Sequence, residues 1–112
     1  MGKVKFKLSD GKTPEKADGT VKVYAPMDLT LLSGDKLSVG VGVSFSVPVL
    51  LLENPYMKKQ GLVLANAGTI VFPGTEAVAN ISLESDDALE LSRGQTLLFA
   101  LPLESNFKLE QE

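Results

Sequence analysis

Carboxylates are the main groups in this sequence that could carry out chemistry, because the chain contains neither histidine nor cysteine. Histidine is the commonest general base and metal ligand near neutral pH, so its absence excludes most hydrolytic triads and zinc sites. The densest acidic cluster is Glu84, Asp86 and Asp87. Such a cluster suits a hard cation such as Ca²⁺, but Ser-Asp-Asp is also ordinary turn chemistry. We expect a solvated turn, with no bound metal or cofactor.

The glycine motifs that bind phosphates are incomplete here. Residues 40–45 read Gly-Val-Gly-Val-Ser-Phe, which begins like a dinucleotide fingerprint, but Phe45 stands where that pattern requires a third glycine. The segment also lies inside a predicted strand, whereas the fingerprint joins a strand to a helix. Residues 33–36 lack the flanking spacing of a Walker loop. Neither segment predicts a nucleotide site.

Alternation of apolar and polar residues at every second position dominates the chain and predicts strands. The clearest strand covers residues 37–47, with Leu, Val and Phe on one face and small or polar residues on the other. Gly40 and Gly42 weaken a strand, so we expect another backbone to approach them closely. Lys3, Lys5 and Lys7 alternate with apolar residues, which predicts a half-buried edge strand with a basic outer face.

The other expected elements are short and regularly spaced. Val21 and Val23 begin a second strand, and residues 56–60 are the only expected helical turn. The remaining expected strands are Leu62–Leu64, Thr69–Phe72, Ala77–Leu83, Ala88–Leu91 and Thr96–Leu101. Eight or nine short strands predict an all-β sandwich, jelly roll or closed barrel. We expect one domain over residues 1–103 and a polar C-terminal tail over residues 104–112.

Charge and hydropathy limit the kinds of partner that we expect for this chain. The net charge is −3, with nine lysines against six acids in residues 1–59 and eight acids against two basic residues thereafter. Such a split suits self-association or docking, whereas an acidic balance argues against nucleic acid as a partner. The longest apolar run, residues 47–52, is far too short to span a bilayer. The alternating N-terminus is unlike a signal peptide, so we expect a cytoplasmic protein, or a virion protein if the source is viral.

Several segments taken in order carry a family resemblance. They are residues 8–26 ending in Tyr-Ala-Pro, residues 28–34, Val41–Pro48, Lys59–Leu62, Ala67–Ile70 and Leu91–Leu101 with Arg93-Gly94. Together they resemble the trimeric dUTPase family and its dCTP deaminase relatives over nearly the whole chain. The resemblance implies a dUTPase-like distorted jelly roll or β-barrel that assembles as a homotrimer.

The same resemblance implies that the functional positions of the family are lost. The aspartate of its first motif aligns with Lys22, and the aspartate that activates water aligns with Val71, which cannot accept a proton. The phosphate-gripping Pro-Arg-Ser-Ser motif reads Leu-Glu-Asn-Pro-Tyr-Met at residues 52–57. The glutamine of the fourth motif aligns near Ala100, and no glycine follows Gly94 to form the closing arm. We therefore predict no catalytic residues.

What remains of the family's nucleotide site is the segment aligned with its substrate-recognition hairpin, which contains Gly68, Thr69, Ile70 and Phe72. Three functions stay open. The first is a non-enzymatic structural or interaction protein on a trimer scaffold, such as a decoration or head accessory protein of a phage capsid. The second is a catalytically inactive nucleotide-binding regulator that keeps this hairpin. The third is an active dUTP or dCTP pyrophosphatase.

Overall fold

Twelve strands and one short helix make up the described part of the computed structural model, which is residues 2–104 and 106–112. In chain order they are β1 Gly2–Leu8, β2 Glu15–Ala17, β3 Thr20–Tyr24, β4 Leu29–Leu31, β5 Lys36–Phe45, β6 Val49–Glu53, α1 Pro55–Lys59, β7 Leu62–Leu64, β8 Ile70–Val71, β9 Glu76–Leu83, β10 Leu89–Leu91, β11 Thr96–Pro102 and β12 Phe107–Gln111. The all-β class is confirmed. Met1 and Ser105, which fall in the expected domain and tail, lie outside the described residues.

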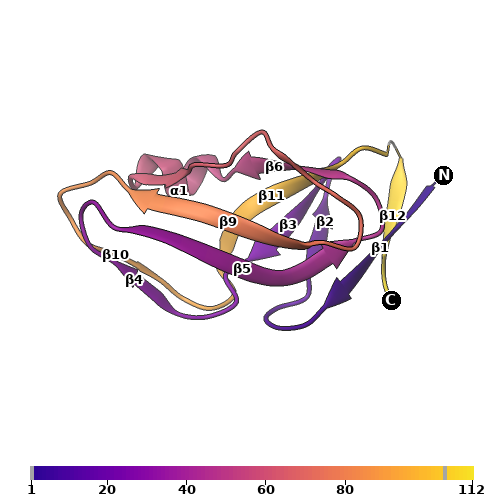
Figure 1. The fold of residues 1–112 in the computed structure, drawn as a ribbon, viewed down its shortest axis with the longest axis horizontal. Helices are drawn as coiled ribbons and strands as arrows, with labels where there is room; N and C mark the ends of the chain where they lie inside the picture. The colour runs from indigo at the N-terminus through magenta and orange to yellow at the C-terminus, as the bar shows by residue number, and fades with distance from the viewer. Residues whose placement is uncertain (1, 105) are drawn as a thin grey trace.

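Two five-stranded sheets pack against each other. The first sheet has the order β12-β1-β5-β9-β7, and the second sheet has the order β2-β3-β11-β6-β8. Strands β4 and β10 form a separate two-stranded ladder at one end of the molecule, which is 45 Å long and 21–23 Å across (Figure 1). Every pairing in the described residues is antiparallel except that of β1 with β12.

The core lies between the two sheets and is built from alternate residues of each long strand. In β5, the residues Val39, Val41, Val43 and Phe45 are at most 4% exposed, as the alternation predicts. Leu37 differs from the expectation, because it is 40% exposed. It lies near the start of β5, next to the exposed β4–β5 turn, where the core no longer covers it.

Gly42 confirms the expected close approach of a second backbone to β5. Its φ is +75°, and a Cβ built on it would lie 2.5 Å from the carbonyl oxygen of Asp10. The Ser9 N–H donates to the Gly42 carbonyl oxygen at 2.7 Å, and the β5–β9 register shifts between Gly40 and Ser44. The expectation is wrong for Gly40, whose nearest neighbour is the side chain of Glu76.

The C-terminal segment is not a tail, which corrects the expected domain boundary. Residues 107–111 form β12, which pairs with β1 along its whole length. Phe107 is 2% exposed and anchors the strand in the core, although the neighbouring residues are polar because they face solvent. Strand β1 therefore lies between β12 and β5. The expectation that its lysines protect a sheet edge is wrong, because β1 is not an edge strand.

Other elements depart from the sequence expectations in smaller ways. The apolar run of residues 47–52 contributes most of β6, which lies between β11 and β8, and β2 and β4 are short strands in segments expected to be loop or left unassigned. Helix α1 begins at Pro55, and the Asn54 side chain accepts a hydrogen bond from the Tyr56 N–H as its cap. No helix among the described residues is long and apolar enough to cross a membrane.

Candidate functional site

The segment predicted to be a vestigial nucleotide hairpin lies at the free edge of the second sheet. Gly68 adopts a φ of +82°, and its N–H donates to the Leu51 carbonyl oxygen at 2.7 Å. The Thr69 hydroxyl donates to the Asn66 carbonyl oxygen at 2.8 Å, and the Thr69 carbonyl oxygen accepts from the Leu51 N–H at 3.0 Å. These bonds fix the backbone against β6 and direct β8 along it.

The two apolar members of this segment are exposed to solvent. Ile70 in β8 lies opposite Leu50 in β6 and is 48% exposed. Phe72 follows β8 in the turn that leads to β9 and is 70% exposed, the largest exposure among the apolar residues described. Single exposed apolar residues are common on protein surfaces, so the relevant question is whether Phe72 belongs to a larger apolar surface.

Ile70 and Phe72 belong to a larger apolar surface, which we name the outer apolar face. Across the second sheet, Ile70 lies opposite Leu50, which lies opposite Leu101, and Leu52 lies opposite Phe99 in the neighbouring row. These half-buried or exposed side chains point away from the core, because the residues between them are buried. The outer apolar face comprises Leu50, Leu52, Ile70, Phe72, Phe99, Leu101 and Leu103.

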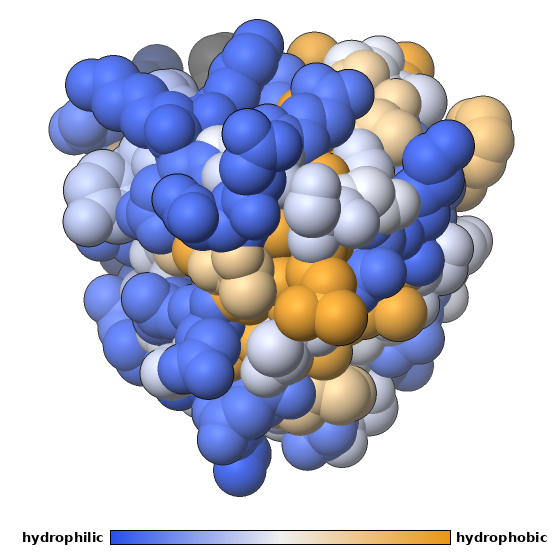
Figure 2. Space-filling model, turned by 90° about the vertical axis from the view of Figure 1, so that its left-hand side faces the viewer, coloured by the Kyte–Doolittle hydropathy of each residue, from blue (hydrophilic) through white to orange (hydrophobic). Residues whose placement is uncertain are grey.

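A second apolar area lies at the end of the molecule that carries β4, β10 and α1. Figure 2 shows it as a small area surrounded by hydrophilic residues. The most exposed apolar residue of the β4–β5 turn is Leu32, at 59%. The outer apolar face differs because it continues across three adjacent strands, β11, β6 and β8.

Two of the positions aligned with the family's carboxylates lie on opposite sides of the second sheet. Lys22 is on the outer side, opposite Phe99 of β11 and Glu15 of β2. Val71 is on the inner side, opposite the fully buried Val49, and packs against the core. Within one chain these side chains therefore do not share a site.

The acidic cluster forms an ordinary exposed turn between β9 and β10. Glu84, Asp86 and Asp87 are all exposed, and the Asp87 N–H donates to the Ser85 hydroxyl oxygen at 3.2 Å. In the part of the chain that the structure describes, no group of three or more acidic, histidine or cysteine side chains is gathered as a metal site.

Tyr24, which looks isolated in the sequence, is a buried residue with charged neighbours. It is 6% exposed, and the Lys12 ammonium lies 4.1 Å from the centre of its ring. Burial raises the pKa of the Tyr24 phenol, and the nearby carboxylate of Glu15 adds to that increase. Sequence alone could not reveal this contact, because Lys12 belongs to a loop whose path only the fold determines.

Comparison with solved structures identifies the architecture, although no model of a known protein family and no curated protein matches the sequence. The dUTPase of Staphylococcus bacteriophage 80alpha superposes with a TM-score of 0.74 at 15% identity, over 97% of this chain and 95% of that one. A point mutant of the same phage enzyme with dUpNHpp gives a TM-score of 0.77 at 14% identity, over 100% and 97%. The EIAV dUTPase gives 0.72 at 19% identity, over 94% and 92%. This chain has the dUTPase fold.

The comparison with dUTPases establishes the fold of this chain but not its function. The dUTPase-like fold expected from the resemblance is confirmed. At 14–19% identity the likeness is one of fold, so function rests on the residues of this chain. Their most prominent feature is the outer apolar face.

Proposed function

We propose that this protein is a non-enzymatic structural or interaction protein that assembles as a homotrimer on its dUTPase-like scaffold. The observation that carries the proposal is the outer apolar face, which contains Ile70 at 48% and Phe72 at 70% exposure. Continuous exposed apolar surfaces on small domains mark protein contacts. We assign this face to contact between copies of the chain, because the resemblance to trimeric dUTPases implies self-association around an axis.

The size of the outer apolar face suits a stable contact. Complete burial of a Leu, Ile or Phe side chain contributes about 1.5–3 kcal/mol, so finishing the burial of seven half-exposed side chains contributes about 5–10 kcal/mol per chain. Association costs an estimated 4–15 kcal/mol in lost freedom of motion. Three such contacts in a closed ring therefore support assembly, whereas a single contact would be weak.

Light scattering coupled to size-exclusion chromatography tests the assembly. We expect the wild-type mass to be three times that of one chain, and Ile70→Lys to give a mass near that of one chain because it places a charge within the contact. Leu32→Lys is the matched control, since Leu32 is 59% exposed but lies outside the outer apolar face. It should remain trimeric. A wild-type mass equal to one chain would contradict the proposal.

The absence of catalysis is part of the proposal and has its own test. Lys22 and Val71 stand where the family resemblance expects carboxylates, and valine has no group that can accept a proton. We expect pyrophosphate release from dUTP and dCTP with Mg²⁺ to stay at the level of the enzyme-free blank. Turnover above that blank would establish a pyrophosphatase instead.

For the partner of the trimer we propose a viral capsid shell, which the protein would decorate. Two arguments support this choice: the proposed trimer of a small β-domain would suit docking on a symmetric shell, and phage dUTPases are among the similar structures. Its gene should then lie among phage head and tail genes. A position among genes for nucleotide metabolism would favour the alternative below.

The alternative function is an inactive nucleotide-binding regulator. Two observations favour it: the exposed Phe72 beside Gly68 and Thr69 in the hairpin segment, and the description of the similar phage dUTPases as controlling the transfer of virulence genes by a G protein-like mechanism. Calorimetry with dUTP and dCTP in the presence of Mg²⁺ separates the two functions. Binding that Phe72→Ala abolishes would favour the regulator, and no binding favours the structural role.

A further inference from the structure

A small hollow opens on the outer side of the first sheet, where β1 meets the end of β5. It has a volume of about 140 Å³, and its lining includes Lys5, Lys7, Ser44, Ser46 and Glu112. A water occupies about 30 Å³ of liquid volume, so the hollow has room for one small ion of several atoms but not for a nucleotide. It lies on the other sheet from the outer apolar face.

The strand register brings the basic and hydroxyl groups together. Lys7 lies opposite Ser44 in the β1–β5 ladder. One step along, the Lys5 N–H donates to the Ser46 hydroxyl oxygen at 2.8 Å, and the Ser46 N–H donates to the Lys5 carbonyl oxygen at 2.8 Å. The Ser46 side chain is thereby fixed while its own O–H remains able to donate. The hollow is therefore lined by two lysines and two serines, and cations with hydroxyl donors are the chemistry that recognises an oxyanion.

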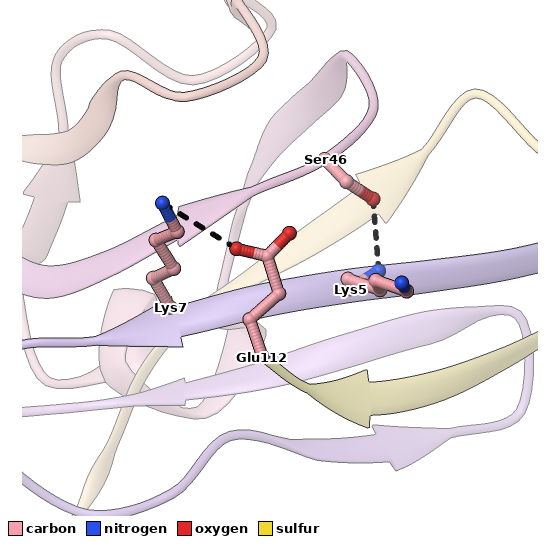
Figure 3. A network of polar contacts seen from close by, with 4 residues as sticks. All are labelled: Lys5, Lys7, Ser46 and Glu112. Atoms are coloured by element: carbon pink, nitrogen blue, oxygen red, sulfur yellow. Dashed lines mark hydrogen bonds and ion pairs between the residues drawn. The ribbon is translucent and has the colours of Figure 1, made fainter.

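The chain already places an oxyanion at this point. The Glu112 carboxylate lies between Lys7 and the Lys5–Ser46 pair (Figure 3), and its Oε2 is 3.5 Å from the Lys7 ammonium. The backbone of Glu112 is held there by a hydrogen bond from its N–H to the Phe6 carbonyl oxygen at 2.8 Å. A charge-assisted hydrogen bond is about 2.7–2.9 Å long, so the carboxylate contact is loose and a better-fitting anion can replace it.

We propose that this hollow is an oxyanion-binding site for one phosphate-sized group, and that Glu112 is its internal competitor in the free chain. The site takes a phosphate or a carboxylate group, free or carried by a partner molecule. Lys5 and Lys7 supply the charge, and the hydroxyls of Ser44 and Ser46 supply the directed hydrogen bonds. Binding displaces the Glu112 side chain toward solvent and leaves β12 in place, because its backbone pairing with β1 is unaffected.

Amide shifts in ¹⁵N NMR spectra test the site, with inorganic phosphate and acetate as separate probes and chloride holding the ionic strength constant. We expect saturable shifts at Lys5, Lys7, Ser44 and Ser46. Glu112→Gln should tighten binding about two- to fivefold, because it removes a competing charge of the size that exposed ion pairs contribute. Phosphate binding without acetate binding would identify a phosphate site, and binding of both would identify a general oxyanion site.

Two lysine variants decide between a built site and diffuse attraction. Lys5→Gln should weaken phosphate binding at least about fivefold. Lys108→Gln removes the same charge from an exposed residue of β12 that does not line the hollow, so it should leave binding unchanged. Equal effects of the two variants, shifts that rise linearly without saturation, or no gain in Glu112→Gln would each overturn the proposal. Circular dichroism melting of each variant checks that the fold is intact.

Discussion

The close approach of the β1–β2 loop to β5 can be tested by adding a single methyl group at Gly42. In Gly42→Ala the new Cβ would lie 2.5 Å from the Asp10 carbonyl oxygen and 3.1 Å from the Asp10 carbonyl carbon. Real Cβ atoms do not come that close to backbone, so either the loop or β5 must move. The φ of +75° at this position adds a second cost, because alanine disfavours the left-handed region.

Both costs can be estimated. The left-handed conformation costs about 1–2 kcal/mol for a residue with a Cβ, and forcing an extra carbon into a packed site costs about 1–3 kcal/mol. Their sum, about 2–5 kcal/mol, is a large share of the about 5–15 kcal/mol that stabilises a typical domain. At about 4 °C per kcal/mol for a chain of this length, the melting temperature should fall by about 8–20 °C.

Substitutions at two other glycines separate the conformational cost from the steric cost. The assay is a urea titration followed by circular dichroism at one protein concentration. Gly34 has a φ of +82° but open space around it, so Gly34→Ala should show only the conformational cost of about 1–2 kcal/mol. Gly40 has no positive φ and meets only the flexible Glu76 carboxylate at 3.0 Å, so Gly40→Ala should be nearly neutral. If Gly42→Ala were no less stable than Gly34→Ala, the close approach would not constrain the fold.

Three further predictions concern the core, the last strand and the buried tyrosine. Val43→Asp puts an unpaired charge at a residue that is 2% exposed, so the folded circular dichroism signal should be lost; wild-type melting would contradict the strand assignment. Phe107→Ala should lower the free energy of unfolding by about 3–5 kcal/mol in urea. Leu32→Ala, at a residue 59% exposed and outside the outer apolar face, should change it by less than about 0.5 kcal/mol; equal losses would mean that β12 does not depend on Phe107. Burial raises the pKa of Tyr24, so a Tyr56→Phe variant should form tyrosinate, measured by ultraviolet absorbance, only above pH about 10. Because the unfolded chain loses this proton first, the stability that Tyr24 contributes is complete below pH about 10 and is lost as the pH rises through the folded-state pKa.

Local sequence patterns predicted the strands whose alternation is strict. Residues 37–47 and 77–83 alternate because one face meets the core, and both segments form strands close to the predicted bounds. Strand β6 was missed because Leu50, Leu51 and Leu52 are apolar on both faces, which hides the period of two. Strand β12 was missed because only Phe107 and the half-buried Leu109 pack on the core, while the other residues of the segment are polar or charged.

The candidate surface could not be predicted from local patterns, because it depends on which strands become neighbours. Leu50, Ile70 and Leu101 are separated by 20 or more residues and form one row only through the β8–β6–β11 pairing. The oxyanion hollow has the same origin, since Lys7, Ser44 and Glu112 come from three separate strand regions. The resemblance located the hairpin segment, but only the register shows that its exposed side chains continue an apolar sheet face.

The positions aligned with the family's reactive groups have consistent structural roles in this chain, and this supports the proposed loss of catalysis. Val71 completes an inner row with Val49 at the edge of the core, where a carboxylate would lose solvation without gaining a partner. Ala100 is fully buried and lies opposite Val21 and Leu51 in the neighbouring strands. These residues stabilise the sheet. Val71→Asp alone would therefore add a destabilising charge without rebuilding a site. The structural roles of these positions, together with the outer apolar face, support the proposed role in holding a partner.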